Sequence, residues 1–250
     1  MSTTVDDATV PSLTGPRHEL VLTALHRILK PRTYLEIGIE RGDTLRAAQC
    51  ATIAIDPAFS VDQSIIGNKP ECLLYRMPSD RFFEQHDPVA LLGDRIDMAF
   101  LDGMHLYEFL LRDFMNVERC CRRNSLILLH DCVPTDLYLA RRLRQDESLR
   151  PITRIPGGWC GDVWKTLLIL RQYRPDLRIE TFDAALTGLV VVTNLDPKSE
   201  VLSEKYVEAV ESYATLDLKD YGVRRYYDGL NMLDARTLID PIQLARYAWL

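Results

Sequence analysis

Residues 34–44 (YLEIGIERGDT) form the first segment whose residue types could do chemistry. An apolar run ends in a Gly-x-x-x-Gly turn made by Gly38 and Gly42, and a capped helix is expected to follow. Such a turn exposes backbone N–H groups and lets a ligand approach the chain closely. Glu36 adds a carboxylate that suits a cationic or hydroxyl-bearing ligand. Glu40 replaces the second glycine of a nicotinamide-binding turn and would repel a pyrophosphate, although an ordinary strand-to-helix turn remains an alternative.

Two further carboxylates follow other apolar runs. Asp56 ends the run 51–56, and Asp102 ends the run 96–102. Ligands of open α/β sheets bind at the carboxyl ends of the strands, where an acid can accept both hydrogen bonds of a ribose diol. His105 comes three residues after Asp102, and a histidine with a near-neutral pKa suits general-base catalysis. The non-functional alternatives are that Asp56 only starts a turn and that His105 only caps or packs against a helix.

The elements that must position these residues alternate regularly along the chain. The strands are continuously apolar, as in parallel sheets covered on both faces. We expect strands at residues 33–38, 51–56, 72–76, 96–102 and 125–131, and helices at 16–30, 43–50, 79–86, 107–121, 136–145 and 162–173. Two last strands, 177–182 and 188–194, are too close in sequence for a parallel crossover and should pair antiparallel.

This order predicts an α/β fold with a Rossmann-like seven-stranded sheet. Five strands are parallel, a C-terminal hairpin closes the sheet, and helices cover both faces. We expect a disordered tail over residues 1–15, one domain over 16–196, and a helical C-terminal extension over 197–250 that is a lid or a dimer contact.

At this point the chain resembles the class I S-adenosylmethionine-dependent methyltransferases. Glu36, Gly38 and Gly42 match that family's Glu/Asp-x-Gly-x-x-x-Gly segment, and Asp56 matches its ribose-binding acid. The resemblance implies S-adenosyl-L-methionine as cofactor. It also places the residues after the third and fourth strands at the cofactor, namely Ser79, Asp80 and Asp102.

The Asp102-Gly-x-His105-x-Tyr pattern resembles bacterial small-molecule O-methyltransferases that modify sugars or secondary metabolites. The resemblance implies that Asp102 and His105 are catalytic, with His105 as the base that removes a hydroxyl proton during methyl transfer. Methylation at nitrogen and cofactor binding without catalysis are the alternatives. The absence of an Asn/Asp-Pro-Pro-aromatic motif argues mildly against the first of them.

Asp102, His130 and Asp131 occupy positions comparable to the metal ligands of metal-dependent O-methyltransferases. A divalent ion there would bind the acceptor's oxygens. Oxygen ligands suit Mg²⁺, whereas His130 favours Mn²⁺, Fe²⁺ or Zn²⁺. The alternative is that both residues only bind the loop and the substrate.

The 250-residue chain carries a net charge of −6, so no basic field indicates nucleic acid or an anionic membrane as a partner. No apolar run approaches the ~20 residues of a membrane span, and the N-terminus lacks the order of a signal peptide. The six cysteines form no Cys-x-x-Cys pair and are expected to be reduced and mostly buried. We therefore expect a cytoplasmic enzyme with a small-molecule acceptor, and the oligomeric state is left open.

The glycine-rich segment 156–161 leads into a helix. Trp159 in this segment either forms a wall of the acceptor pocket or belongs to a loop that only connects two elements.

Overall fold

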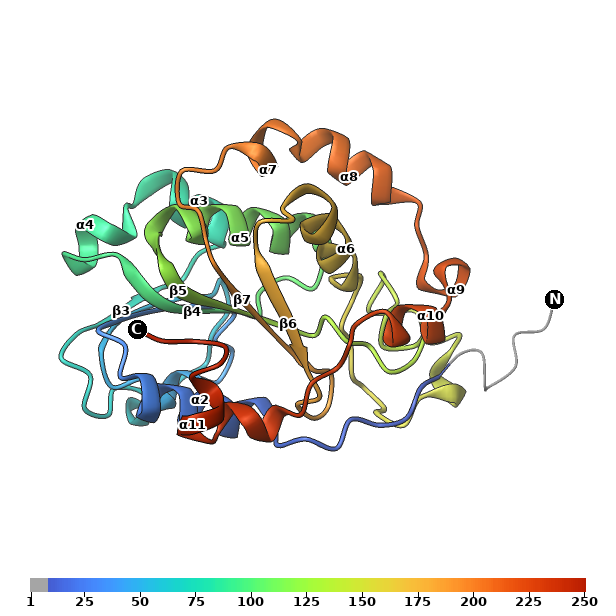
Figure 1. Ribbon diagram of the computed structural model, residues 1–250, viewed down its shortest axis with the longest axis horizontal. Helices are drawn as coiled ribbons and strands as arrows, with labels where there is room; N and C mark the ends of the chain where they lie inside the picture. The colour runs from blue at the N-terminus through green and yellow to red at the C-terminus, as the bar shows by residue number, and fades with distance from the viewer. Residues whose placement is uncertain (1–8) are drawn as a thin grey trace.

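A seven-stranded sheet forms the centre of the computed structural model, which describes residues 9–250 (Figure 1). Its strand order is β3-β2-β1-β4-β5-β7-β6. The first five strands are parallel, and β7 pairs antiparallel with both β5 and β6. This topology confirms the predicted fold class. The strands are β1 (Thr33–Ile37), β2 (Ala51–Ile55), β3 (Cys72–Tyr75), β4 (Ile96–Leu101), β5 (Cys121–His130), β6 (Arg178–Phe182) and β7 (Leu189–Thr193).

Helices cover both faces of the sheet (Figure 1). One face carries α3 (Ser79–Gln85), α4 (Pro88–Leu92), α5 (Tyr107–Cys120) and α6 (Trp164–Tyr173), with α7 (Val201–Glu204) and α8 (Tyr206–Ala214) lying outside them. The opposite face carries α2 (His18–Leu29), η1 (Leu45–Ala47), η4 (Ala235–Leu238) and α11 (Pro241–Leu244). The remaining short elements are η2 (Gln63–Ile65), η3 (Arg150–Ile152), α9 (Leu218–Tyr221) and α10 (Val223–Asp228).

Two apolar cores result from the alternation of side chains along each strand. In β1, Leu35 and Ile37 belong to the core under α5 and α6, whereas Tyr34 belongs to the core under α2. Because both cores are closed, every residue of β1 is buried. Continuous apolar runs in the sequence therefore do mark covered parallel strands here.

The helix expected at residues 43–50 is absent, and the structure has only the 3₁₀ turn η1 at this place. Thr44 makes no cap hydrogen bond to the backbone. Its hydroxyl instead donates a short hydrogen bond to the buried carboxylate of Glu36. Thr44 therefore binds a buried carboxyl group instead of capping a helix.

Residues 136–145 also form turns rather than the expected helix. Arg141 donates to the carbonyl oxygens of Tyr138 and Arg144, which a helix would pair with backbone N–H groups four residues on. The loop is thus stabilised by a side chain, which local periodicity does not reveal.

Both ends of the described chain pack against the sheet. Residues 1–8 of the predicted disordered tail lie outside the described residues, but 9–15 are ordered, with Val10 and Leu13 buried in the sheet's apolar core. The C-terminal extension passes from one face of the sheet to the other, from α8 to α11 (Figure 1). Its second half packs on the same face as α2, with Ala235, Leu238 and Leu244 buried there.

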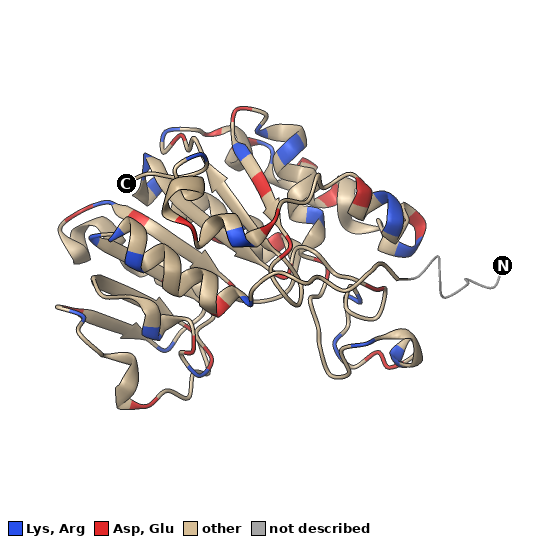
Figure 2. Ribbon diagram, turned by 60° about the horizontal axis from the view of Figure 1, so that its bottom comes forward, with Lys and Arg blue, Asp and Glu red and all other residues tan. Residues whose placement is uncertain are grey.

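Acidic and basic side chains are interspersed over the ribbon rather than gathered on one face (Figure 2). Among the described residues, no helix is long and apolar enough to cross a membrane. All six cysteines are free thiols, and all but Cys72 are buried.

Candidate active site

A cavity of about 640 Å³ opens at the carboxyl edge of the parallel strands. Its lining comes from the residues that follow β1 to β4 and from the long loop after β5. These residues are Ile37, Gly38, Glu40, Ile55, Asp56, Pro57, Pro78, Ser79, Asp80, Asp102, Gly103, Met104, His105, Phe109, Arg144, Gly157 and Trp159. The sheet edge thus brings together six predicted site residues from four separate segments of the chain.

Gly38 and Asp56 shape the end of the cavity above β1 and β2. Gly38 has a φ of +86°, and a Cβ atom there would lie 1.9 Å from the carbonyl oxygen of Asp102. Only glycine permits this close approach of two strand ends. The Asp56 carboxylate accepts hydrogen bonds from the N–H groups of Glu40 (2.9 Å) and Ala58 (2.6 Å). It is therefore fixed at the cavity wall.

Glu36 and Gly42 do not line this cavity, and their contact with a cofactor stays a prediction. The side chain of Glu36 points into the core below the sheet edge, where Tyr34 and Thr44 donate to it. Burial, opposed by these two hydrogen bonds, raises the pKa of Glu36 to about 7. Gly42 packs against Ile65 instead. The motif is recognisable in sequence, but strand alternation decides which of its residues line the cavity.

Ser79 and Asp80 lie at the end of the cavity near β3, as predicted. Both carboxylate oxygens of Asp80 are taken by Arg112, at 2.8 and 2.7 Å. The hydroxyl of Ser79 is close enough to lower the pKa of the neighbouring Asp113, although burial raises that pKa overall to about 7. Asp80 thus lines the cavity as part of an ion pair with Arg112 rather than as an unpaired carboxylate.

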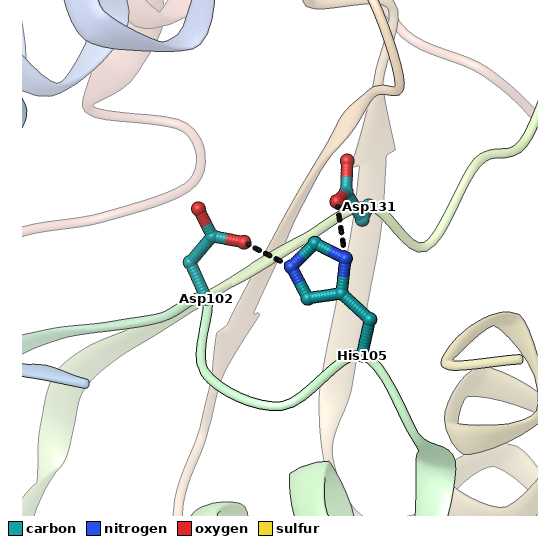
Figure 3. Close-up of side chains that lie close together, drawn as sticks. All are labelled: Asp102, His105 and Asp131. Carbon is teal, nitrogen blue, oxygen red and sulfur yellow. Dashed lines mark ion pairs between the residues drawn. The ribbon is translucent and has the colours of Figure 1, made fainter. Parts of the chain in front are cut away.

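His105 lies between two carboxylates at the other end of the cavity (Figure 3). Its Nε2 atom is 3.5 Å from Asp102, and its Nδ1 atom is 3.2 Å from Asp131. Nδ1 is also 2.6 Å from the carbonyl oxygen of Trp159. Because a carbonyl only accepts, Nδ1 carries a proton and Nε2 is the atom left to exchange one.

His130 is packed beside this group. Its Nδ1 atom lies 3.1 Å from Asp102 and 3.4 Å from Asp131. The ring of His18, the first residue of α2, lies 4.0 Å from the His130 ring between centroids. Thr187 donates a hydrogen bond to Asp131 and closes the cluster. Neither His18 nor Thr187 was expected, because nothing in their local sequence marks them.

The charges in this cluster are strongly coupled. Burial alone would lower the pKa of His105, but the hydrogen bond to Asp102 and the charge of Asp131 raise it to about 9. His130 behaves alike, with burial outweighed by the same two carboxylates. Burial opposes ionisation of Asp102, yet the two imidazoles hold its pKa well below the usual range. Burial, with the charge of His130, lowers the pKa of His18 to about 4.

The donor set fits a divalent cation. One ligand atom from each of Asp102, His105 and Asp131 lies within 4.8 Å of the others. The predicted set had His130 in place of His105, so the tertiary structure adds a second imidazole to the two carboxylates. Carboxylate and imidazole together suit Mn²⁺, Fe²⁺ or Zn²⁺ better than Mg²⁺.

Two tryptophans of the loop and helix after β5 have different places. Trp164 is buried at the start of α6, where it packs against Tyr226. Trp159 lines the cavity, and its ring is stacked on His105 with 5.1 Å between centroids. Asp162, in the same segment, accepts a hydrogen bond through its carboxylate from the N–H of Tyr107 at the start of α5.

Residues 35–132 match the family model described as a methyltransferase domain. The segment is less than half of the chain, and it contains β1 to β5 with Gly38, Asp56, Asp102, His105 and Asp131. The predicted resemblance to methyltransferases is thereby confirmed over this segment. No curated protein matches the chain.

Several solved structures are similar at low identity. The O-methyltransferase TomG from Streptomyces achromogenes, involved in tomaymycin synthesis and solved with S-adenosylmethionine, is 14% identical, with 70% of this chain and 78% of that chain covered and a TM-score of 0.47. An O-methyltransferase from Bacillus cereus, solved with S-adenosylhomocysteine, is 13% identical, with 73% and 83% covered and a TM-score of 0.47. The methyltransferase PaMTH1 from Podospora anserina is 16% identical, with 71% and 76% covered and a TM-score of 0.45.

Proposed function

We propose, on the premise that residues 35–132 form a methyltransferase domain, that this chain transfers a methyl group from S-adenosylmethionine to an oxygen of a small hydroxylated acceptor. A sugar or a secondary metabolite is the acceptor class. The observation that carries the proposal is the single cavity that joins Gly38 and Asp56 to the Asp102–His105–Asp131 cluster. A cofactor held at one end then has its reactive group near a histidine at the other.

The cofactor would lie along the strand ends in the order of the sheet. Asp56 would accept the ribose hydroxyls, Gly38 would let the chain approach the methionine part, and the residues after β3 would hold the adenine. Asp80 is paired with Arg112, so we assign adenine recognition to Ser79 and the backbone rather than to the Asp80 carboxylate.

In the reaction the acceptor's oxygen attacks the sulfonium methyl in line, so that the C–O bond forms as the C–S bond breaks. The hydroxyl proton passes to Nε2 of His105, and the sulfonium becomes the neutral thioether sulfur of S-adenosylhomocysteine. To act as a base, His105 must first lose the proton that its raised pKa keeps on the ring at neutral pH. A bound sulfonium would lower this pKa, because a neighbouring positive charge disfavours the protonated ring. Catalysis then consists mainly of positioning and proton removal.

Binding of S-adenosylhomocysteine to wild type and to Asp56→Asn tests the cofactor site. We expect the substitution to weaken binding at least tenfold, because it replaces the carboxylate that would accept the ribose diol. Isothermal titration calorimetry measures the affinity, with Glu71→Gln as an exposed control outside the cavity. Equal affinity in both proteins, or no binding to wild type, would overturn the proposed site.

A divalent cation, when bound, would polarise the acceptor's hydroxyl. Asp102 and Asp131 would hold it. Nε2 of His105 is needed to accept the hydroxyl proton, so it is not available as a metal ligand. We therefore assign the nitrogen ligand to Nδ1 of His130, which lies 3.1 Å from Asp102 and 3.4 Å from Asp131.

We expect chelation to lower turnover at least tenfold, and we expect added Mn²⁺ to restore it, while affinity for S-adenosylhomocysteine stays unchanged. Labelled-cofactor assays before and after dialysis against a chelator measure this. Full activity of the metal-free protein would remove the cation from the proposal and leave His105 as the sole aid to proton removal.

A further inference from the structure

One cationic side chain of the cavity, Arg144, has no acidic partner. The cavity is otherwise lined by carboxylates, those of Glu40, Asp56, Asp80 and Asp102. Among residues 9–250, no carboxylate lies within ion-pair distance of the Arg144 guanidinium, although its neighbour Arg142 pairs with both Glu108 and Asp162. Arg144 is exposed at the edge of the cavity, so its guanidinium is free to pair with the negative charge of a ligand.

The place of Arg144 is built by its own loop. Arg141 is 8% exposed, and its guanidinium donates to the carbonyl oxygens of Tyr138, Gly158 and Arg144. The backbone carbonyl oxygen of Arg141 accepts a hydrogen bond from the indole N–H of Trp159 at 2.7 Å. Arg141 thus joins the two limbs of the loop, 138–144 and 157–159, and fixes the backbone that presents Arg144.

Arg144 lies over the ring of Trp159, with its guanidinium carbon 5.7 Å from the ring centroid. Trp159 in turn stacks on His105 and binds the Nδ1 of that histidine through its carbonyl. The three side chains therefore form one wall, which runs from the proposed proton acceptor to the free cation. Phe109 and Met104 supply apolar surface nearby.

The order of the sheet separates this wall from the cofactor end. Asp80 and Asp56 follow β3 and β2 at one side, whereas His105 follows β4 and Trp159 belongs to the loop after β5. An anion bound by Arg144 would thus lie on the acceptor's side of the transferred methyl.

We propose that Arg144 binds a carboxylate or phosphate group of the methyl acceptor, so that the acceptor of this enzyme is anionic, with a flat or apolar part covered by Trp159. The proposal rests on the proposed function and names its substrate class. The competing source of the same chemistry is the α-carboxylate of the cofactor itself, which the experiment must separate.

The probes are benzoate and its neutral analogue benzamide, titrated into wild type, Arg144→Gln and the same-loop control Arg150→Gln by ligand-detected NMR. Arg150 pairs with Glu147 and does not line the cavity. We expect wild type and Arg150→Gln to bind benzoate at least tenfold more tightly than benzamide, and Arg144→Gln to lose this preference. Equal binding of the two probes by wild type, or a preference that survives in Arg144→Gln, overturns the proposal.

Titration of S-adenosylhomocysteine, which carries the cofactor's carboxylate, separates the two anion sources. Unchanged affinity in Arg144→Gln supports an acceptor anion, whereas a tenfold loss assigns Arg144 to the cofactor and overturns the proposal. If wild type binds no S-adenosylhomocysteine, the proposed function fails by itself. The benzoate titration, made without cofactor, still decides whether Arg144 binds an anion.

Discussion

At the scale of single residues, His105 illustrates how tertiary contacts define a chemical role. The sequence motif places it three residues after Asp102, but its tautomer depends on the carbonyl of Trp159, 54 residues away. The loop after β5 therefore leaves Nε2 as the atom that can take a proton from the acceptor.

His105→Gln tests this role. We expect turnover to fall by about 10² to 10⁴, the range that general-base catalysis contributes, because glutamine cannot accept a proton. Affinity for S-adenosylhomocysteine should stay within about threefold of wild type. Labelled-cofactor turnover and calorimetry measure the two effects. A variant that binds the cofactor and retains full turnover would show that His105 is not the base.

Glu36 shows the reverse case, in which a residue of the recognised motif serves the fold. It is fully buried, and two hydroxyl groups donate to it. Its position in a strand that alternates between two closed cores keeps it away from the cavity. A residue of the sequence motif can thus lie in the core rather than in the cavity wall.

At the scale of elements, α2 contains a buried histidine without a hydrogen-bond partner. Both ring nitrogens of His26 are buried and unpaired in the described part of the chain, and the ring packs edge-on against Tyr34. Burial, with a smaller contribution from the charge of Lys69, lowers the pKa of His26 to about 3. The unfolded chain therefore binds a proton that the native state does not.

Stability that depends on neutral His26 is present above its ordinary pKa of 6.5 and is lost as the pH falls toward 3. We expect His26→Leu to remove this loss and to gain about 2 kcal/mol more at pH 5 than at pH 8, since one pKa unit corresponds to about 1.4 kcal/mol. Urea unfolding at the two pH values measures the difference. An equal effect at both would show that His26 is not the group that titrates.

The loop after β5 is the element that sequence periodicity misassigned. Its expected helix at 136–145 is replaced by turns around Arg141, and these turns place Arg144 and Trp159 in the cavity. Irregular backbone at this edge supplies part of the site, as is common for loops carried on a rigid sheet.

At the scale of the whole molecule, the C-terminal extension completes the fold. No described residue after 196 lines the cavity, and a lid role of the extension stays a prediction. The hydroxyl of the buried Tyr226 donates to the carbonyl oxygens of Cys132 and Trp164, which joins the extension to the end of β5 and to α6. A dimer contact through the extension stays a prediction.

We expect Tyr226→Phe to lower the free energy of unfolding by about 1 to 2 kcal/mol, because two buried acceptors lose their donor. Tyr227→Phe, a partly buried neighbour in the same helix, is the control and should change stability by less than about 0.5 kcal/mol. Chemical denaturation measures both. Equal effects would mean that ring packing, rather than the hydroxyl, joins the extension to the domain.

The sequence by itself determined the parallel strands, the closing hairpin and the carboxylates and histidine at the strand ends. Continuous apolar runs and polar residues at strand ends are local features, and any parallel sheet covered on both faces requires such runs. Tertiary structure alone decided that Glu36 faces the core, that η1 replaces a helix, and that Trp159 and Arg144 complete the cavity. Each of these depends on a contact between residues distant in sequence, such as the Arg141 hydrogen bond to the carbonyl of Gly158, and no local pattern encodes such a contact.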